Sequence, residues 1–281
     1  MSSAITFHLY RYQLLPIDRH GQGDLLDTRS TQDILKVKNQ IFAEAVSRLQ
    51  QMTGRRTDAI VKVENAGKDE FILQIAPNRS LQLETEDFKT ELLPNWPRVL
   101  AIIFNRDDEQ IVAIQHRTSA FAGTDIAVNL LRAATKRHLE SNHLRAIFAP
   151  IFNEHYFWEL VAAHENQIKE IHFELVTPNM ANISNVLPDE LKDFAKNVNA
   201  VRTDLRLKAD DASALDIDKS DTALQGLVEY ASEGGGDIAL RIKGFRKKVH
   251  TSTSRKDIVI GELELSTAPD VLVQILRDLM K

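Results

Sequence analysis

Apolar residues recur along this chain with two different periods, and this alternation constrains the fold more than any other feature. Ile5, Phe7 and Leu9 alternate with polar residues, which is the period of a strand. Residues 32–52 place apolar residues three and four positions apart, which predicts one helix beginning after Thr31. Runs of both kinds continue to the last residues. We therefore expect an α+β protein with mixed or antiparallel sheets flanked by helices.

The elements fall into two halves of similar size. In the first half we predict strands at 59–64, 70–76 and 81–93, a hairpin of 98–105 with 110–117, and a helix at 125–140. In the second half we predict strands at 145–149, 170–177, 205–207, 237–243 and 257–265, and helices at 153–165, from Pro188, from Asp221 to 232, and at the end of the chain. The predicted domains are residues 1–143, an N-terminal α+β domain, and residues 144–281, a C-terminal α+β domain with a basic ribbon.

Composition excludes several classes of protein. The chain has no cysteine, which excludes a disulfide scaffold, a thiolate zinc site and a cysteine nucleophile. No stretch approaches the roughly 18–20 apolar residues of a membrane span, and the first residues lack the basic and apolar segments of a signal peptide. We expect a soluble, cytoplasmic protein without membrane association.

Catalytic and metal-binding motifs are absent from the sequence. There is no phosphate-binding Gly-x-x-x-x-Gly-Lys-Ser/Thr, no Gly-x-Ser-x-Gly and no His-Glu-x-x-His, so the sequence predicts neither an enzyme nor a cofactor or metal. One enzymatic alternative stays open, in which Asp18, His20 and Glu159 converge only in the fold.

Basic residues are concentrated late in the chain. The net charge is −5, but residues 236–256 contain seven basic residues and one acidic residue, Asp237. Such a segment on an acidic chain indicates a directed electrostatic surface. The candidate DNA-binding residues are Arg241, Lys243, Arg246, Lys247, Lys248, Arg255 and Lys256.

The pattern of this segment predicts a two-stranded ribbon. Ile238, Leu240 and Ile242 would point into the core, so that the cations share the opposite face. The tip, Thr251-Ser252-Thr253-Ser254, adds small hydroxyl groups. Guanidinium, ammonium and hydroxyl groups are the donors that contact phosphate backbones, and the scarcity of aromatic residues favours double-stranded DNA over single strands.

The order of elements also resembles a known group of proteins. Leu92-Leu93-Pro94-Asn95-Trp96-Pro97, the hairpin of 98–105 and 110–117, and Thr124-Asp125 at the start of a helix resemble the first domain of RexA phage-exclusion proteins. Two α+β halves with a late basic region are similar to KwaB-like proteins of the Kiwa defence system. The resemblance concerns the arrangement of about half of the chain, and no functional residue is carried over. It implies a non-enzymatic, dimeric DNA-binding protein of anti-phage defence or phage exclusion.

Two functions from different classes follow. The first is a DNA-binding accessory protein, a homodimer that contacts phosphates largely without sequence specificity. The alternative is a protein-interaction module, an adaptor or inhibitor, whose basic ribbon docks on an acidic protein partner. In a third interpretation the lysines bind no ligand, and their charge prevents the edge of the sheet from pairing with other chains.

Overall fold

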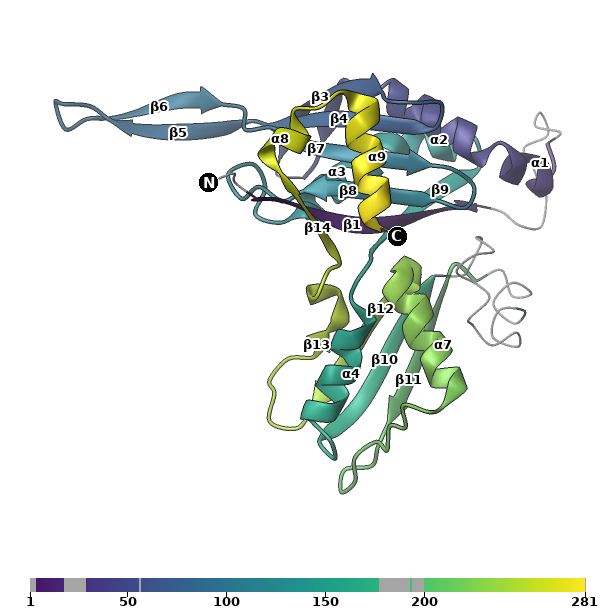
Figure 1. Ribbon diagram of the computed structural model, residues 1–281. Coiled ribbons are helices and arrows are strands. Elements are labelled where there is room, and N and C mark those ends of the chain that lie inside the picture. The colour runs from purple at the N-terminus through teal and green to yellow at the C-terminus, as the bar shows by residue number, and fades with distance from the viewer. Residues whose placement is uncertain (1–3, 18–28, 56, 177–192, 194–199, 281) are drawn as a thin grey trace. The chain divides into compact units, whose positions relative to one another are not determined.

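The computed structural model describes residues 4–17, 29–55, 57–176, 193 and 200–280, and it confirms the predicted α+β class (Figure 1). The chain forms two compact units. The first comprises Met1–His8, Pro16–Ala146 and Ile258–Lys281, and the second comprises Leu9–Leu15 and Ile147–Asp257. The predicted division at 143/144 thus lies close to one boundary, but the last residues group with the first unit and a short amino-terminal segment groups with the second.

The larger sheet has eight strands in the order β14-β1-β8-β7-β4-β3-β2, and β9 pairs with β1. Its strands are β1 (Ala4–Pro16), β2 (Gln51–Thr53), β3 (Asp58–Asn65), β4 (Glu70–Pro77), β7 (Val99–Asn105), β8 (Gln110–Gln115), β9 (Leu144–Pro150) and β14 (Asp257–Gly261). The predicted hairpin is confirmed as β7 paired with β8. Figure 1 shows α9 (Pro269–Met280) on one face of this sheet and α2 (Lys38–Ser47) with α3 (Thr124–Glu140) on the other.

The predicted single helix at 32–52 is wrong. It is divided into α1 (Thr31–Lys36) and α2, because Val37 leaves the helical region with ψ near 8°. The helix begins one residue earlier than predicted, since the side chain of Ser30 accepts the amide of Asp33 and the Asp33 carboxylate accepts the amide of Ser30. Met52 belongs to β2, which pairs with β3. The pairing of β2 with β3 therefore outweighs the helical spacing of apolar residues that predicted a helix up to Met52.

A two-stranded arm replaces the single strand predicted at 81–93. In the part of the chain that the structure describes, β5 (Arg79–Glu84) and β6 (Thr90–Asn95) pair with each other alone, through six antiparallel positions. The connecting turn holds Phe88 in the left-handed region, with φ of 58°. Figure 1 shows this arm extending away from the larger sheet of its own unit.

The second unit contains a four-stranded antiparallel sheet in the order β11-β10-β12-β13. Its elements are β10 (Ile168–Val176), β11 (Arg202–Lys208), β12 (Gly236–Ile242), β13 (Val249–His250), α4 (Glu154–Ala163) and α7 (Thr222–Tyr230). Both helices cover the same face of the sheet (Figure 1), and Phe157, Phe173 and Tyr230 are fully buried between them. The helix predicted from Pro188 lies outside the described residues.

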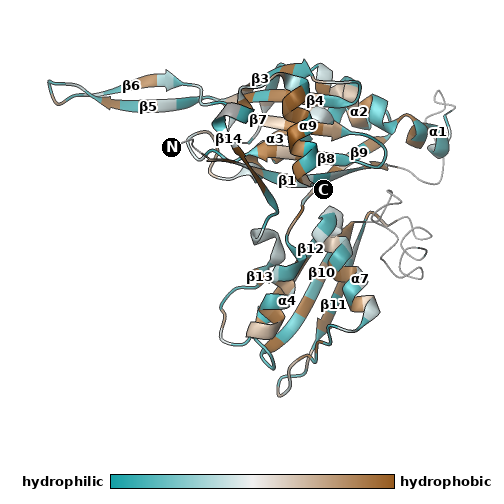
Figure 2. Ribbon diagram, in the orientation of Figure 1, coloured by the Kyte–Doolittle hydropathy of each residue, from teal (hydrophilic) through white to brown (hydrophobic). Residues whose placement is uncertain are grey.

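The two faces of this sheet differ in polarity. Ile171, Phe173 and Leu175 alternate along β10 with Glu170, His172 and Glu174, and the apolar set belongs to the core. Figure 2 shows the same alternation as bands along β10 and β12. Charged side chains therefore occupy the face that α4 and α7 leave open.

The predicted two-stranded ribbon is wrong. β12 lies between β10 and β13, and the strand that follows it in sequence pairs with it at two positions, Ala239 with His250 and Leu240 with Val249. The segment predicted as the return strand, 257–265, forms β14 in the larger sheet and then α8 (Glu262–Leu265). The period of two correctly placed Ile238, Leu240 and Ile242 in the core, but it does not specify which strand is the neighbour.

A glycine-rich turn connects α7 to β12. Asp221 caps α7 as predicted, accepting the amides of Ala223 and Leu224 at 2.9 Å. The chain then turns through η1 (Ala231–Gly235), where Gly234 has φ of 82°. A Cβ at Gly234 would overlap the Cβ of Arg11, so this position requires glycine for two reasons.

In the part of the chain that the structure describes, no helix is both long enough and apolar enough to cross a membrane.

Replacing Gly234 by alanine tests this close approach, and Gly244→Ala is the matched control. Gly244 has nearly the same backbone conformation, with φ of 87°, but nothing lies within 4 Å of its Cβ position. We expect Gly244→Ala to lower the free energy of unfolding by about 1 kcal/mol, the cost of left-handed backbone, and Gly234→Ala to lower it by about 3 kcal/mol, because steric overlap is added. Urea denaturation measures both. Equal losses would contradict the packing of Gly234 against Arg11.

Candidate functional site

Seven cations gather at the end of the four-stranded sheet where β10 begins. We call this group the basic end; it consists of Arg206, Lys208, Arg241, Lys243, Arg246, Lys247 and Lys248. The strand register explains the gathering, because Glu170 of β10 lies opposite Lys208 on one side and Arg241 on the other. Five of the seven predicted site residues are in this group.

One carboxylate lies at the centre of the basic end. The Glu170 side chain is only 9% exposed, and its Oε1 lies 2.7 Å from Nζ of Lys248 and 3.4 Å from Nε of Arg206. The hydrogen bond from Lys248 and the positive charges of Lys248, Arg206 and Arg241 hold the pKa of Glu170 below its usual range. Glu170 is thus ionised at neutral pH and binds Arg206 of β11 and Lys248 of the loop after β12, beside Arg241 of β12.

The loop of residues 243–248 presents further cations to solvent. Its start is fixed by two backbone hydrogen bonds, from Lys243 to Gln167 at 2.9 Å and from Phe245 to Ile242 at 3.2 Å. The ring of Phe245 packs edge-on against His164, with 5.2 Å between centroids. Arg246 and Lys247 follow as exposed residues. Among the residues that the structure describes, no carboxylate forms an ion pair with either of them or with Lys243.

Two residues outside the predicted set complete the basic end. Arg206 and Lys208 are exposed on β11, about 35 residues before the basic segment in sequence. The sequence signal was weak, because Asp204, Asp210 and Asp211 accompany them. Only the pairing of β11 with β10 brings their charges to the same place.

The acidic residues of this region have local structural roles. The Asp210 carboxylate accepts the amides of Ala212 and Ser213, and the Asp218 carboxylate accepts the amide and hydroxyl of Ser220. These hydrogen bonds lower the pKa of both carboxyl groups.

Arg255 and Lys256, the other two predicted residues, are not in the basic end. The guanidinium of Arg255 lies 5.6 Å from the centre of the Tyr10 ring, and the backbone of Lys256 hydrogen-bonds to Leu9 and Ile151. The tip of hydroxyl residues 251–254 also differs from the prediction, which placed it beside the cations. Thr251 is fully buried and its hydroxyl contacts Asp237, so it does not stand beside the cations.

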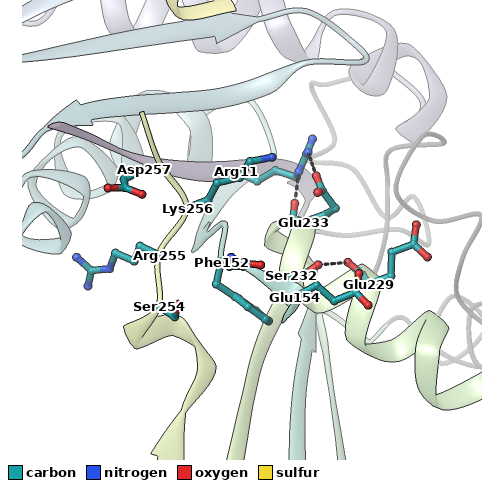
Figure 3. Close-up of a pocket in the computed structure, with 11 residues that line it drawn as sticks. Arg11, Phe152, Glu154, Glu229, Ser232, Glu233, Ser254, Arg255, Lys256 and Asp257 are labelled. Carbon is teal, nitrogen blue, oxygen red and sulfur yellow. Dashed lines mark hydrogen bonds and ion pairs between the residues drawn. The ribbon is translucent and has the colours of Figure 1, made fainter. Parts of the chain in front are cut away.

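Arg255 and Lys256 instead line a polar cavity of about 810 Å³ in the second unit (Figure 3). Arg11 also lines it; its side chain is 5% exposed, and its guanidinium binds both the backbone carbonyl and the carboxylate of Glu233, the latter at 3.1 Å. Figure 3 shows Arg11 and Glu233 directed at each other and Arg255 directed away from them.

The charges of this cavity nearly balance. Its three basic residues face four acidic ones, Glu154, Glu229, Glu233 and Asp257. Glu154 in addition accepts a hydrogen bond from the indole of Trp158 at 2.9 Å. Because both signs are present in similar number, the cavity has no excess of positive charge that would favour a polyanion.

The residues of the enzymatic alternative are not brought together by the described structure. Asp18 and His20 lie outside the described residues, and Glu159 is exposed on α4, 3.3 Å from His155. Among the described residues, no group of three or more histidine or carboxylate side chains is arranged to hold a metal ion.

Comparison of the chain with known protein families and with curated proteins finds no match.

Replacing Glu170 by glutamine tests its role at the centre of the basic end. The folded pKa lies below the ordinary value near 4.5, so the stabilisation is present at neutral pH and is lost as the pH falls through the folded pKa. We expect Glu170→Gln to lower the free energy of unfolding by about 1.5–3 kcal/mol near pH 7, the range for hydrogen bonds to charged groups, and by much less near pH 3.

The control is Glu174→Gln, on the same strand and face but 41% exposed. It should change the free energy of unfolding by less than about 0.5 kcal/mol. If Glu170→Gln lowers the free energy of unfolding as much near pH 3 as near pH 7, the stabilisation does not come from the ion pairs of Glu170.

Proposed function

We propose that this chain is a non-enzymatic DNA-binding accessory protein that contacts the phosphate backbone of duplex DNA through the basic end. The observation that carries the proposal is the excess of positive charge there: Glu170 binds Lys248 and Arg206, and Lys208 and Arg241 lie opposite it on the neighbouring strands, while Lys243, Arg246 and Lys247 remain exposed. Neutralisation of phosphates by such cations releases condensed counterions from DNA, which drives binding without reading the bases.

The arrangement of the cations supports contact with an extended polyanion. Arg206 and Lys208 lie on one side of β10 and Arg241 on the other, while Arg246 and Lys247 extend beyond the end of the strands. Guanidinium and ammonium groups are thus distributed over two strands, β11 and β12, and the loop of residues 243–248. A row of phosphates, unlike a single anion, offers a partner to each of them.

Arg246 and Lys247 carry the largest share of the proposed contact. Lys248 is 22% exposed and already bound to Glu170, whereas Arg246 and Lys247 are exposed. Lys248 and Arg206 therefore serve mainly to shape the basic end, and the loop cations remain for the ligand. The proposal accordingly does not include Arg255 and Lys256.

The biological setting and the homodimer are part of the proposal and rest on other grounds. The resemblance of the element order to phage-exclusion and Kiwa proteins supports a role in anti-phage defence. A homodimer would present two basic ends and double the number of phosphates that one particle neutralises, which steepens the dependence of affinity on salt.

Fluorescence anisotropy of a labelled 30-base-pair duplex tests the DNA contact. We expect the logarithm of the binding constant to fall linearly with the logarithm of salt concentration, with a slope of about −0.9 per phosphate contacted. The double reversal Arg246→Glu/Lys247→Glu should weaken binding by at least about tenfold at low salt. It should leave the melting temperature unchanged, because both side chains are exposed.

The matched control is Lys62→Glu/Lys68→Glu, the same charge change at two exposed lysines of the first unit. Its affinity for the duplex should fall only by the small amount that the change in net charge causes, and should otherwise equal that of the wild type. Equal weakening in both variants would remove the basic end from the proposal. No binding of the wild type at low salt would overturn DNA binding altogether and favour an acidic protein as the partner.

A further inference from the structure

The β5–β6 arm exposes an apolar face without cover among the described residues. Leu81 pairs directly with Leu93, and Leu83 is on the same face; these three side chains are 47%, 43% and 42% exposed. Phe88 at the tip is 97% exposed. An isolated two-stranded hairpin is marginally stable in water, so such an arm calls for a surface to pack against.

The arm also has a distinct charge. Glu84, Glu86, Asp87 and Glu91 surround its tip, and Lys89 is the one basic residue among them. All five are exposed. The surface that this arm fits is therefore apolar along the ladder and basic where the tip lies.

The same unit contains a groove of this character beside α3. We call it the α3 groove; it consists of two adjoining hollows of about 610 and 360 Å³ that share Asn129 and Ala133. Ile126 and Leu130 give the first hollow an apolar wall. The second hollow is lined by Arg132, Lys136 and Arg145, against one carboxylate, Glu140.

Two details of the groove favour an acidic occupant. Nε of Arg145 is buried and has no hydrogen-bond partner among the described residues. Arg55 and Arg79 stand at the apolar hollow, so that both hollows carry positive charge. Carboxylates of an inserted segment would compensate these charges.

The base of the arm adjoins the groove. Arg79, the first residue of β5, lines the apolar hollow, and its Nε and Nη2 donate to the carbonyl of Ala120 at 3.0 and 2.7 Å, just before α3. Six paired positions keep the arm extended, so its tip does not reach the groove at its own base. A second copy related by a two-fold axis near Arg79 can accept the arm and insert its own.

We propose that two copies of this chain associate by reciprocal insertion of the β5–β6 arm into the α3 groove of the other copy. Leucines of the arm cover Ile126, Leu130 and Ala133, and the acidic tip meets Arg132, Lys136 and Arg145. This names the interface of the homodimer in the proposed function, but it does not depend on DNA binding, since none of these residues belongs to the basic end.

Sedimentation velocity of the full chain without DNA, over roughly 1–100 µM, tests the proposal. The wild type should dimerise, and the arm variant Leu81→Ser/Leu93→Ser should raise the dimer dissociation constant by at least about tenfold, as expected for central apolar contacts. The control Leu279→Ser removes a leucine that is 52% exposed on α9 of the same unit. It should dimerise like the wild type.

Charge exchange between arm and groove makes the test specific. The arm variant Glu86→Lys/Asp87→Lys and the groove variant Arg55→Glu/Arg132→Glu should each be monomeric, because arm and groove then carry the same sign of charge. A mixture of the two should dimerise, since each arm again meets a groove of opposite charge. Circular dichroism confirms folding, which these exposed substitutions should not alter.

Three outcomes would overturn the proposal. They are a wild type that stays monomeric over the whole range, a dimer that persists in the arm or groove variants, and a mixture of exchanged variants that stays monomeric. A monomer that still binds duplex DNA would overturn the interface and leave the DNA contact standing. A dimer that fails to bind DNA would overturn the proposed DNA contact and leave the dimer interface standing.

Discussion

The charge balance around Glu170 organises the second unit. Two helices bury one face of its sheet, and charged side chains of the opposite face are partly paired with one another. Near the start of β10 this is done by a carboxylate that draws Lys248 and Arg206 inward and leaves the loop cations outward. Farther along the same face, Asp237 binds His250 at 2.8 Å and Asp204 binds His172 at 3.3 Å. One sheet face thus carries a gradient from basic to acidic.

The first unit also holds a carboxylate between basic side chains, and there the carboxylate is buried. Glu70 is buried and is bound by Arg277 at 2.6 Å and Arg106 at 2.8 Å. Burial raises its pKa, but these hydrogen bonds outweigh burial and lower it overall. Arg277 belongs to α9, so the pair joins the last helix of the chain to the sheet. Arg277 also lies 3.4 Å from Glu109, so two cations meet two carboxylates here, whereas Arg246 and Lys247 at the basic end remain exposed.

Much of the secondary structure could be predicted from apolar periods, and the parts that could not have physical reasons. The alternation of Ile238, Leu240 and Ile242 places them in the core, but alternation carries no information on the neighbouring strand, and the predicted ribbon failed for that reason. The helical period at 32–52 continued past Leu49, yet pairing with β3 drew Met52 into a strand.

The candidate site was predictable only in part. The basic segment pointed to Arg241, Lys243, Arg246, Lys247 and Lys248, since they are neighbours in sequence. Arg206 and Lys208 were missed because strand register, a long-range property, joins them to the group. Arg255 and Lys256 were included on sequence proximity alone, and the chain turns away before it reaches them. The clustering of charge in the sequence thus predicted the loop residues of the site, but not the residues that β11 contributes.

The acidic tip of the arm has a consequence beyond its fit to a basic groove. Among the described residues each strand of the arm pairs with the other strand alone, and the free edges that this leaves can add strands from other molecules. Four carboxylates beside the tip make two arms repel when they approach each other. These carboxylates therefore act against the growth of fibrils by edge-to-edge pairing of arms.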